Sequence, residues 1–377
     1  MNKNFLMKFS GTLLLISPVL SNYVLFGPVS IGDFTIFLSF LIIIFHVNVN
    51  LFFVYSFLLS LFVVILSLFS FLLNDFIPKS FWRASFFLLI IPFFLSIYRD
   101  YYSIFFKIYL KLSYFFSLVL LFQVSIFYSL GIDWVFQLPI KTYELDTLNI
   151  IDFRSGGFRA AGVFKEPSYF AIFTIPALIY YAKVKNFKKY LFYFVSMLVS
   201  TSSLGIAVSI LSLFIFISIR GINKRSFLII STIFPIFVSS FLFYMFTTQN
   251  IAILRFFELG QGGGSLQERF FTIFDVAQYF TFFVDFNFSY KVLVVSDGWY
   301  NSFIYLVANF GLLFLFPFLV FWKKIGLSSF FATLFLLLLT HSFSNSFFTV
   351  FLILFYYVSN EFYLCHNSNI ISKSQGS

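Results

Sequence analysis

Three cationic residues and one carboxylate, which together could bind and act on a phosphorylated ligand, stand close together in one stretch of the sequence. Arg154, Arg159 and Lys165 are followed directly by Glu166. Arginine is well suited to pyrophosphate, because its planar fork donates two hydrogen bonds and does not deprotonate. Pro167 predicts that a helix begins here, which would place Glu166 near the positive end of the helix dipole and favour its ionised form. The alternative is that Glu166 only starts the helix and that the arginines face lipid headgroups.

A second stretch repeats this combination. Glu268 and Arg269 follow a glycine-rich segment, and Asp297 and Asn301 precede another apolar run. Guanidinium groups from both stretches could grip a large anionic headgroup between them. Other readings stay open, because Arg269 could pair with Asp275 or Glu268, and Asp297 and Asn301 could simply cap a helix.

The composition identifies the setting of these residues as a membrane. Of 377 residues, 60% are hydrophobic and only 10% are charged. Apolar runs near the length that crosses a bilayer recur along the chain, which predicts an all-α integral membrane protein. A single cysteine excludes a disulfide framework, and three scattered histidines argue against a His/Cys metal site, so no cofactor is expected.

About twelve transmembrane helices are expected in this single polytopic domain, residues 1–377. The run 190–219 lies between two basic clusters that the positive-inside rule places on one side, so it should form a hairpin. Thirty helical residues rise about 45 Å, enough for two short or re-entrant segments that turn at Thr201–Gly205. The other predicted spans are 9–27, 31–47, 51–73, 81–98, 108–130, 168–182, 226–246, 299–320, 325–343 and 346–363.

The distribution of charge sets the orientation. The predicted inner side holds 15 basic and 2 acidic residues, and the outer side holds 9 basic and 12 acidic ones. The inner side therefore carries +13 and the outer side −3, which together give the net charge of +10. Both termini are then cytoplasmic, the N-terminal run is an uncleaved span, and the positive charge needs anionic membrane lipid rather than nucleic acid as its partner.

Two long segments, 131–167 and 247–298, are the predicted extracytoplasmic loops. Loops of this length in a compact protein are usually functional or disordered. The glycine-rich patch 260–265 in the second loop lacks the Gly-Lys-Ser/Thr of a nucleotide-binding loop and is interpreted as a turn.

The segment Arg154 to Ala171, with its core Arg-x-x-Gly-Phe-Arg…Gly-Val-Phe-x-Glu-Pro-Ser, resembles a loop-to-helix segment of bacterial O-antigen and capsule repeat-unit polymerases, the Wzy-like family related to O-antigen ligases. The later segment Ser265-x-x-x-Arg269…Asp297-Gly-x-Tyr-Asn301-Ser is similar to that family's second large loop. The likeness covers about 40 residues in motif. Two positions depart from the pattern, because Tyr300 stands where the ligases commonly have His, and Leu204 stands where the family often has Arg.

The resemblance implies a glycosyltransferase at the outer face of the bacterial inner membrane. It would polymerise oligosaccharide repeats carried on undecaprenyl pyrophosphate for lipopolysaccharide, capsule or another surface polysaccharide, and release undecaprenyl pyrophosphate. Glu166 would act as the base or orient the acceptor, Arg154, Arg159 and Arg269 would bind pyrophosphate, and Asp297 and Asn301 would contact sugar. Whether a separate chain-length regulator protein binds is left open, and no metal is implied.

Two other functions compete with this one. A flippase or secondary transporter would suit twelve spans, but transporters usually place functional polar groups at the midplane, whereas nearly all ionisable residues here lie in predicted loops. An O-antigen ligase is the nearer alternative, against which the departure at Tyr300 counts.

Overall fold

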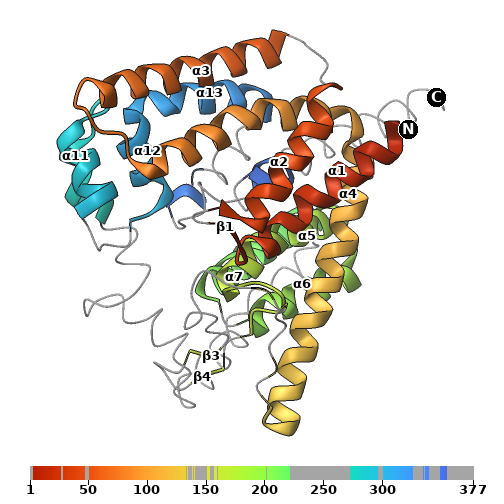
Figure 1. Ribbon diagram of the computed structural model, residues 1–377. Coiled ribbons are helices and arrows are strands. Elements are labelled where there is room, and N and C mark those ends of the chain that lie inside the picture. Colours follow the sequence, from red (N-terminus) through yellow and green to blue (C-terminus); the bar gives the residue numbers. More distant parts are fainter. Residues whose placement is uncertain are drawn as a thin grey trace. The chain divides into compact units, whose positions relative to one another are not determined.

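The computed structural model is mostly helical (Figure 1). This confirms the predicted all-α class for the part of the chain that the structure describes. The described residues are 3–26, 29–46, 51–132, 134, 138, 140, 151–152, 157–158, 160–200, 202–220, 272–295, 300–325, 334, 336–338 and 349–354. The predicted span 226–246 lies outside them, as do most residues of the last two predicted spans.

Four of the described helical segments are long and apolar enough to cross a membrane, which is consistent with an all-α membrane protein. They are Leu51–Leu72, Lys79–Tyr98, Tyr101–Leu130 and Ser302–Phe321. Helix α3 (Leu51–Leu72) matches its predicted span closely, since nothing in this run interrupts the apolar sequence.

The described chain folds as two compact units. Unit 1 comprises residues 1–21, 29–108 and 265–377, and unit 2 comprises residues 22–28 and 109–264. Helix α4 (Lys79–Leu130) contributes to both units, and Tyr101 within it has non-helical dihedral angles. The predicted connection 99–107 between two spans is thus helical except at Tyr101, because it contains no glycine or proline that would end a helix.

In unit 1, a buried hydroxyl cluster joins α1 (Lys3–Leu20), α2 (Ile31–Ile44) and α4. The Ser10 hydroxyl lies 2.8 Å from both the Ser39 hydroxyl and the Tyr98 hydroxyl, and Ser39 also donates to the Ser10 carbonyl. Small residues with satisfied hydroxyls let membrane helices approach closely. Helix α1 begins and ends earlier than the predicted span 9–27, because the polar residues Ser21 and Asn22 form a turn.

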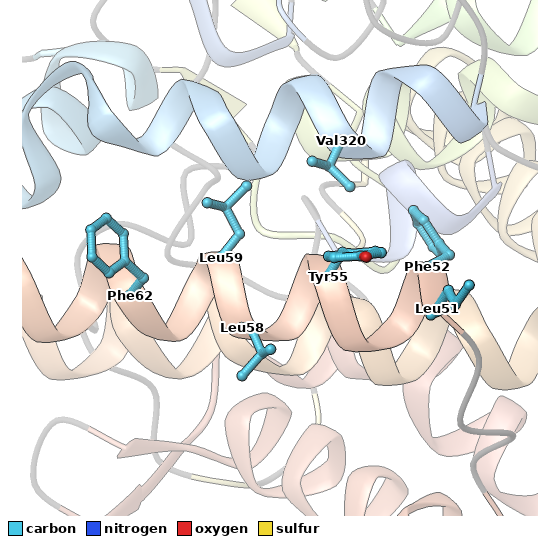
Figure 2. A pocket seen from close by; sticks show the side chains of 7 residues that line it. All are labelled: Leu51, Phe52, Tyr55, Leu58, Leu59, Phe62 and Val320. Carbon is cyan, nitrogen blue, oxygen red and sulfur yellow. The ribbon is translucent and has the colours of Figure 1, made fainter.

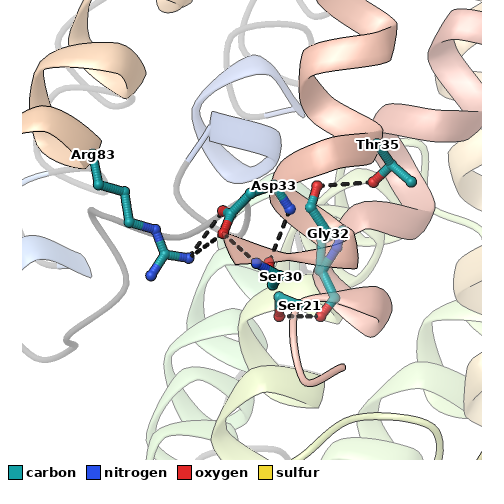
Figure 3. A network of polar contacts seen from close by, with 7 residues as sticks. Ser21, Ser30, Gly32, Asp33, Thr35 and Arg83 are labelled. Carbon is teal, nitrogen blue, oxygen red and sulfur yellow. Dashed lines mark hydrogen bonds and ion pairs between the residues drawn. The ribbon is translucent and has the colours of Figure 1, made fainter. Parts of the chain in front are cut away.

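The first turns of α2 and α4 are tied together by the ion pair between Asp33 and Arg83 (Figure 3). Arg83 Nη2 lies 2.9 Å from each carboxylate oxygen of Asp33. A capping box fixes the carboxylate, because Asp33 accepts from the backbone of Ser30 while the Ser30 hydroxyl accepts from the Asp33 N–H. Strand β2 (Val29–Ser30) leads directly into this cap.

The rest of unit 1 contains a helix that changes course at Gly311. Helix α12 (Ser302–Phe310) ends there, and the 3₁₀ turn η5 (Gly311–Phe314) leads into α13 (Leu315–Ile325). Gly311 has φ +60°, and a side chain there would collide with the backbone of Phe282 and Phe283. The N–H groups of Leu312 and Leu313 donate to the Thr281 and Phe282 carbonyls. These two bonds hold the backbone at Thr281 and Phe282 against the turn η5.

Part of the predicted loop 247–298 is therefore packed structure. Residues 272–276 are helical, and η3 (Ala277–Tyr279), α11 (Phe286–Tyr290) and the π-helical turn η4 (Lys291–Val295) follow. The buried Ser289 hydroxyl donates to the Ala308 carbonyl of α12 at 2.6 Å. This half of the loop belongs to the body of unit 1.

Helices α3 and α13 lie side by side and border an open apolar groove of about 790 Å³ (Figure 2). In the figure, Leu59 of α3 and Val320 of α13 extend toward each other. Tyr55 and Leu58 on α3 are more than half exposed, as expected of a helix whose outer face contacts lipid. The lining consists of Leu51, Phe52, Tyr55, Leu58, Leu59, Phe62 and Val320.

Unit 2 contains β1 (Val24–Phe26), the later part of α4, the antiparallel pair β3 (Ile151–Asp152) and β4 (Gly157–Phe158), and three further helices. Helix α5 (Pro167–Lys183) packs against α6 (Phe187–Val199) and α7 (Ser203–Arg220). The break between α6 and α7 lies within the run 190–219, at the start of the predicted turn Thr201–Gly205, and Ser203–Gly205 already belong to α7. The Ser200 hydroxyl donates to the Met197 carbonyl, and the Ser202 hydroxyl accepts from the Gly205 N–H, which ends one helix and starts the next.

Candidate active site

Glu166 occupies the N-cap position of α5, as the sequence predicted. Its backbone is extended, with φ −136° and ψ 149°, and Pro167 follows as the first helical residue. The Glu166 carbonyl accepts hydrogen bonds from the N–H groups of Tyr169 and Phe170, at 3.0 and 3.3 Å. The proline fixes its own φ and needs no N–H partner, so the start of α5 is fixed at this residue.

The carboxylate of Glu166 does not cap the helix. It makes no side-chain bond to the first backbone N–H groups, and instead Oε2 accepts a hydrogen bond from the Ser168 hydroxyl at 3.1 Å. Both side chains are partly exposed. The carboxylate is therefore held in one orientation beside the positive end of α5 while remaining accessible, which is the arrangement that a general base requires.

The five residues that precede Lys165 form a buried strap, defined here as residues 160–164. Ala160 and Ala161 are fully buried, and the Phe164 ring contacts the rings of Phe116 and Phe173 at centroid distances of 5.4 and 5.3 Å. The Phe164 N–H donates to the Ala161 carbonyl at 3.1 Å. Exposure thus begins at Lys165 and Glu166, directly after a closely packed stretch.

Gly162 brings this strap into contact with α4. Its φ is +62°, and a Cβ atom there would lie 3.3 Å from Leu120 Cβ and 3.4 Å from the Phe116 carbonyl oxygen. Only glycine adopts this conformation without strain and allows the backbone to lie so close to the helix. The sequence prediction did not include this role.

Gln123 on α4 holds the strap through its amide. Its Oε1 accepts from the Gly162 N–H at 2.9 Å, and its Nε2 donates to the Trp134 carbonyl at 2.9 Å. The side chain is fully buried. Sequence reasoning missed this residue, although an amide within an otherwise apolar run is a signal that could have found it.

Helix α5 is fixed from the side by Tyr109. The Tyr109 hydroxyl donates to the Phe173 carbonyl at 2.6 Å and accepts from the Ala177 N–H at 3.0 Å. It therefore lies between two groups that would bond directly in a regular helix. Pro176 is the adjacent residue and lacks an N–H, so the hydroxyl stabilises α5 where proline weakens it.

Asn301 is the N-cap residue of α12. Its Oδ1 accepts from the Ile304 N–H at 3.0 Å, and the side chain is fully buried. Helix capping, the alternative to a sugar contact, is thus what the structure shows for this side-chain oxygen. The sugar contact stays a prediction.

Four of the predicted site residues lie outside the described part of the chain: Arg154, Arg159, Arg269 and Asp297. Glu166 belongs to unit 2 and Asn301 to unit 1. Among the described residues there is no group of three or more His, Cys, Asp or Glu side chains that could hold a metal ion.

The chain was compared with protein-family models, curated proteins and solved structures. No family model, curated protein or solved structure matches the chain.

Proposed function

We propose that this chain polymerises lipid-linked oligosaccharide repeats at the outer face of a bacterial inner membrane. The observation that supports this most directly is the orientation of the Glu166 carboxylate. It is accessible, it is held by Ser168, and it is not used to cap α5. Each residue of the Glu-Pro-Ser motif then has a chemical role: glutamate is the base, proline fixes the start of the helix, and serine orients the glutamate.

In the proposed reaction, a hydroxyl of the terminal sugar on one lipid-linked unit attacks the anomeric carbon of a glycan on undecaprenyl pyrophosphate. The new glycosidic C–O bond forms as the bond from the anomeric carbon to the pyrophosphate oxygen breaks. Glu166 accepts the hydroxyl proton and later releases it to water. Undecaprenyl pyrophosphate leaves with the electron pair of the broken bond.

Charge develops on the leaving pyrophosphate, and we assign its stabilisation to Arg154, Arg159 and Arg269. Asp297 and Asn301 are proposed to contact sugar. Because the Asn301 side chain is fully buried and its Oδ1 is engaged in the cap of α12, its contribution would come through the position of the adjoining backbone. No cofactor is required by this chemistry.

The proposal includes the topology of twelve spans with both ends cytoplasmic and two large outer loops. The Asp33–Arg83 pair is consistent with it, since the first turns of α2 and α4 are both predicted to lie at the outer face. Two spans that both run from the outer face to the inner face begin at the same face, so their first turns can contact each other.

The surface glycan of cells that lack this chain tests the function. Loss of a polymerase leaves single repeats on the final acceptor. A ligase would instead leave the acceptor without glycan, and a transporter would leave repeats trapped on the inner face. Either of the last two patterns on a gel would refute polymerisation, and restoration of the ladder by the full chain is the matching control.

A further inference from the structure

Gln123 makes two hydrogen bonds that tie separate parts of the backbone to α4. It lies about two turns before the end of α4 and is fully buried. Both ends of its amide are engaged by backbone groups at 2.9 Å. A buried amide without partners would cost about 1–3 kcal/mol, so this side chain holds its partners firmly in place.

The two partners come from opposite ends of the predicted loop 131–167. Trp134 follows the end of α4, and Gly162 lies just before α5. The start of the loop is fixed further, because the Trp134 ring contacts Phe122 and the Leu138 N–H donates to the buried Tyr23 hydroxyl at 3.0 Å. A single side chain therefore holds the backbone at both Trp134 and Gly162. Arg154 and Arg159 lie between these two residues in the sequence.

The connection from Gly162 to Glu166 is short and stiff. Only three residues lie between them, Phe164 is packed among aromatic rings, and Pro167 fixes the end. A shift of the backbone at Gly162 would therefore be carried to the Glu166 carboxylate rather than absorbed. Misplacement of a reacting group by about 1 Å can lower a rate about 100-fold.

We propose that Gln123 is a positioning residue for Glu166, which it acts on by holding the strap 160–164 against α4. This inference rests on the proposed function, because it assigns Gln123 a part in the same transfer reaction. Gln123 itself touches no substrate. Its bond to the Gly162 N–H fixes the backbone four positions before Glu166, and its bond to the Trp134 carbonyl fixes the Gln123 amide.

The first experiment measures the strap without reference to activity. Cys365 is replaced by serine and Ala161, which is fully buried, by cysteine. The rate of labelling by a membrane-impermeant maleimide is then measured on intact cells. Gln123→Met, which keeps the length of the side chain but removes both bonds, should raise the labelling rate at least tenfold, and Ser125→Ala on the exposed face of the same helix should not change it. An unchanged rate in Gln123→Met would overturn the anchoring.

The second experiment measures transfer by the purified full chain in vesicles with a defined lipid-linked repeat. Gln123→Met should lower kcat at least tenfold and change KM less than threefold. In a Glu166→Asp background, in which the carboxylate is already displaced, the same change should lower kcat less than twofold. Equal losses in both backgrounds would show a structural effect unrelated to Glu166 and would refute the positioning role.

Failure of this inference and failure of the proposed function are distinguishable. If the strap opens but kcat of Gln123→Met equals that of the wild type, Gln123 does not position the base, while the polymerase assignment stands. If the wild type joins no repeats, the function fails and the positioning role falls with it, and the labelling still decides the anchoring. Should Gln123→Met not accumulate, Gln123→Asn, whose amide is one methylene too short for both bonds, takes its place with the same expected outcomes.

Discussion

The Ser168 hydroxyl donates a hydrogen bond to the carboxylate of Glu166 across 3.1 Å at the start of α5. The two residues flank Pro167, so the serine side chain reaches back over the first turn of the helix. A hydroxyl that engages the carboxylate in this way selects one of its orientations and leaves the other oxygen available.

Replacing Ser168 with alanine should slow polymerisation about fivefold without changing the amount of inserted protein. The loss corresponds to about 1 kcal/mol, the usual net value of one hydrogen bond, because the pair is partly exposed. The rate of repeat addition in vesicles is the measurement. Ser168→Thr, which keeps the hydroxyl, is the control, and a wild-type rate in Ser168→Ala would show that the bond is unimportant.

Gly162→Ala should lower the free energy of unfolding by about 1–3 kcal/mol. It places a side chain at positive φ and within 3.3 Å of Leu120 Cβ. Gly131→Ala is a matched control, since Gly131 has φ +64° but nothing lies within 4 Å of its added Cβ. Thermal unfolding in detergent should therefore show a larger loss for Gly162→Ala, and equal losses would refute close packing of the strap on α4.

Tyr109→Phe should destabilise the protein by about 1–3 kcal/mol. The change removes the hydroxyl that serves both the Phe173 carbonyl and the Ala177 N–H, and leaves two buried backbone groups without it. Tyr114→Phe, at an exposed position on the same helix, should change thermal unfolding little. If α5 closes into a regular helix instead, Tyr109→Phe will unfold at the wild-type temperature, and the hydroxyl is then dispensable.

The Asp33–Arg83 pair should give a coupling energy of about 0.5–1 kcal/mol in a double-mutant cycle. Arg83 is 39% exposed, so solvent weakens the attraction, although the capping box holds Asp33 in place. The cycle uses Asp33→Asn, Arg83→Met and both together, measured by thermal unfolding. Additive losses would mean that the pair does not stabilise the contact between α2 and α4.

Asn301 can be tested for its two roles separately. Asn301→Ser keeps a cap oxygen without burying a charge and should preserve most of the stability, whereas Asn301→Ala should cost about 1 kcal/mol. If Asn301 also contributes to sugar binding, Asn301→Ser, which lacks the amide, should raise KM for the lipid-linked repeat more than the small change in stability explains. An unchanged KM would refute the proposed contribution to sugar binding.

The sequence predicted those parts of the fold that local chemistry determines. Pro167 fixes the start of α5, and the small polar residues from Ser200 to Gly205 end one helix and begin another, so both features follow from short-range preferences. The charges on either side of this run predicted that it turns back, and the break between α6 and α7 lies within it. Neither inference needed any knowledge of tertiary contacts.

The features that the sequence did not reveal depend on residues far apart in the chain. Gln123 gains its importance from Trp134 and Gly162, which are 11 and 39 residues away. The packing of the segment from Thr281 against the break at Gly311 is likewise a long-range contact between polar backbone groups. Hydropathy separates apolar runs from loops, so it assigned that segment to the second loop.

The activity of Glu166→Gln tests most directly whether Glu166 is the base for polymerisation. The purified full chain is placed in vesicles with a defined undecaprenyl-pyrophosphate-linked repeat, and the length of the product is measured for the wild type, Glu166→Gln and Ser125→Ala. We expect a ladder of repeats for the wild type and for Ser125→Ala. At equal amounts of folded protein, Glu166→Gln should give no product longer than a single repeat. A wild-type ladder from Glu166→Gln would contradict it.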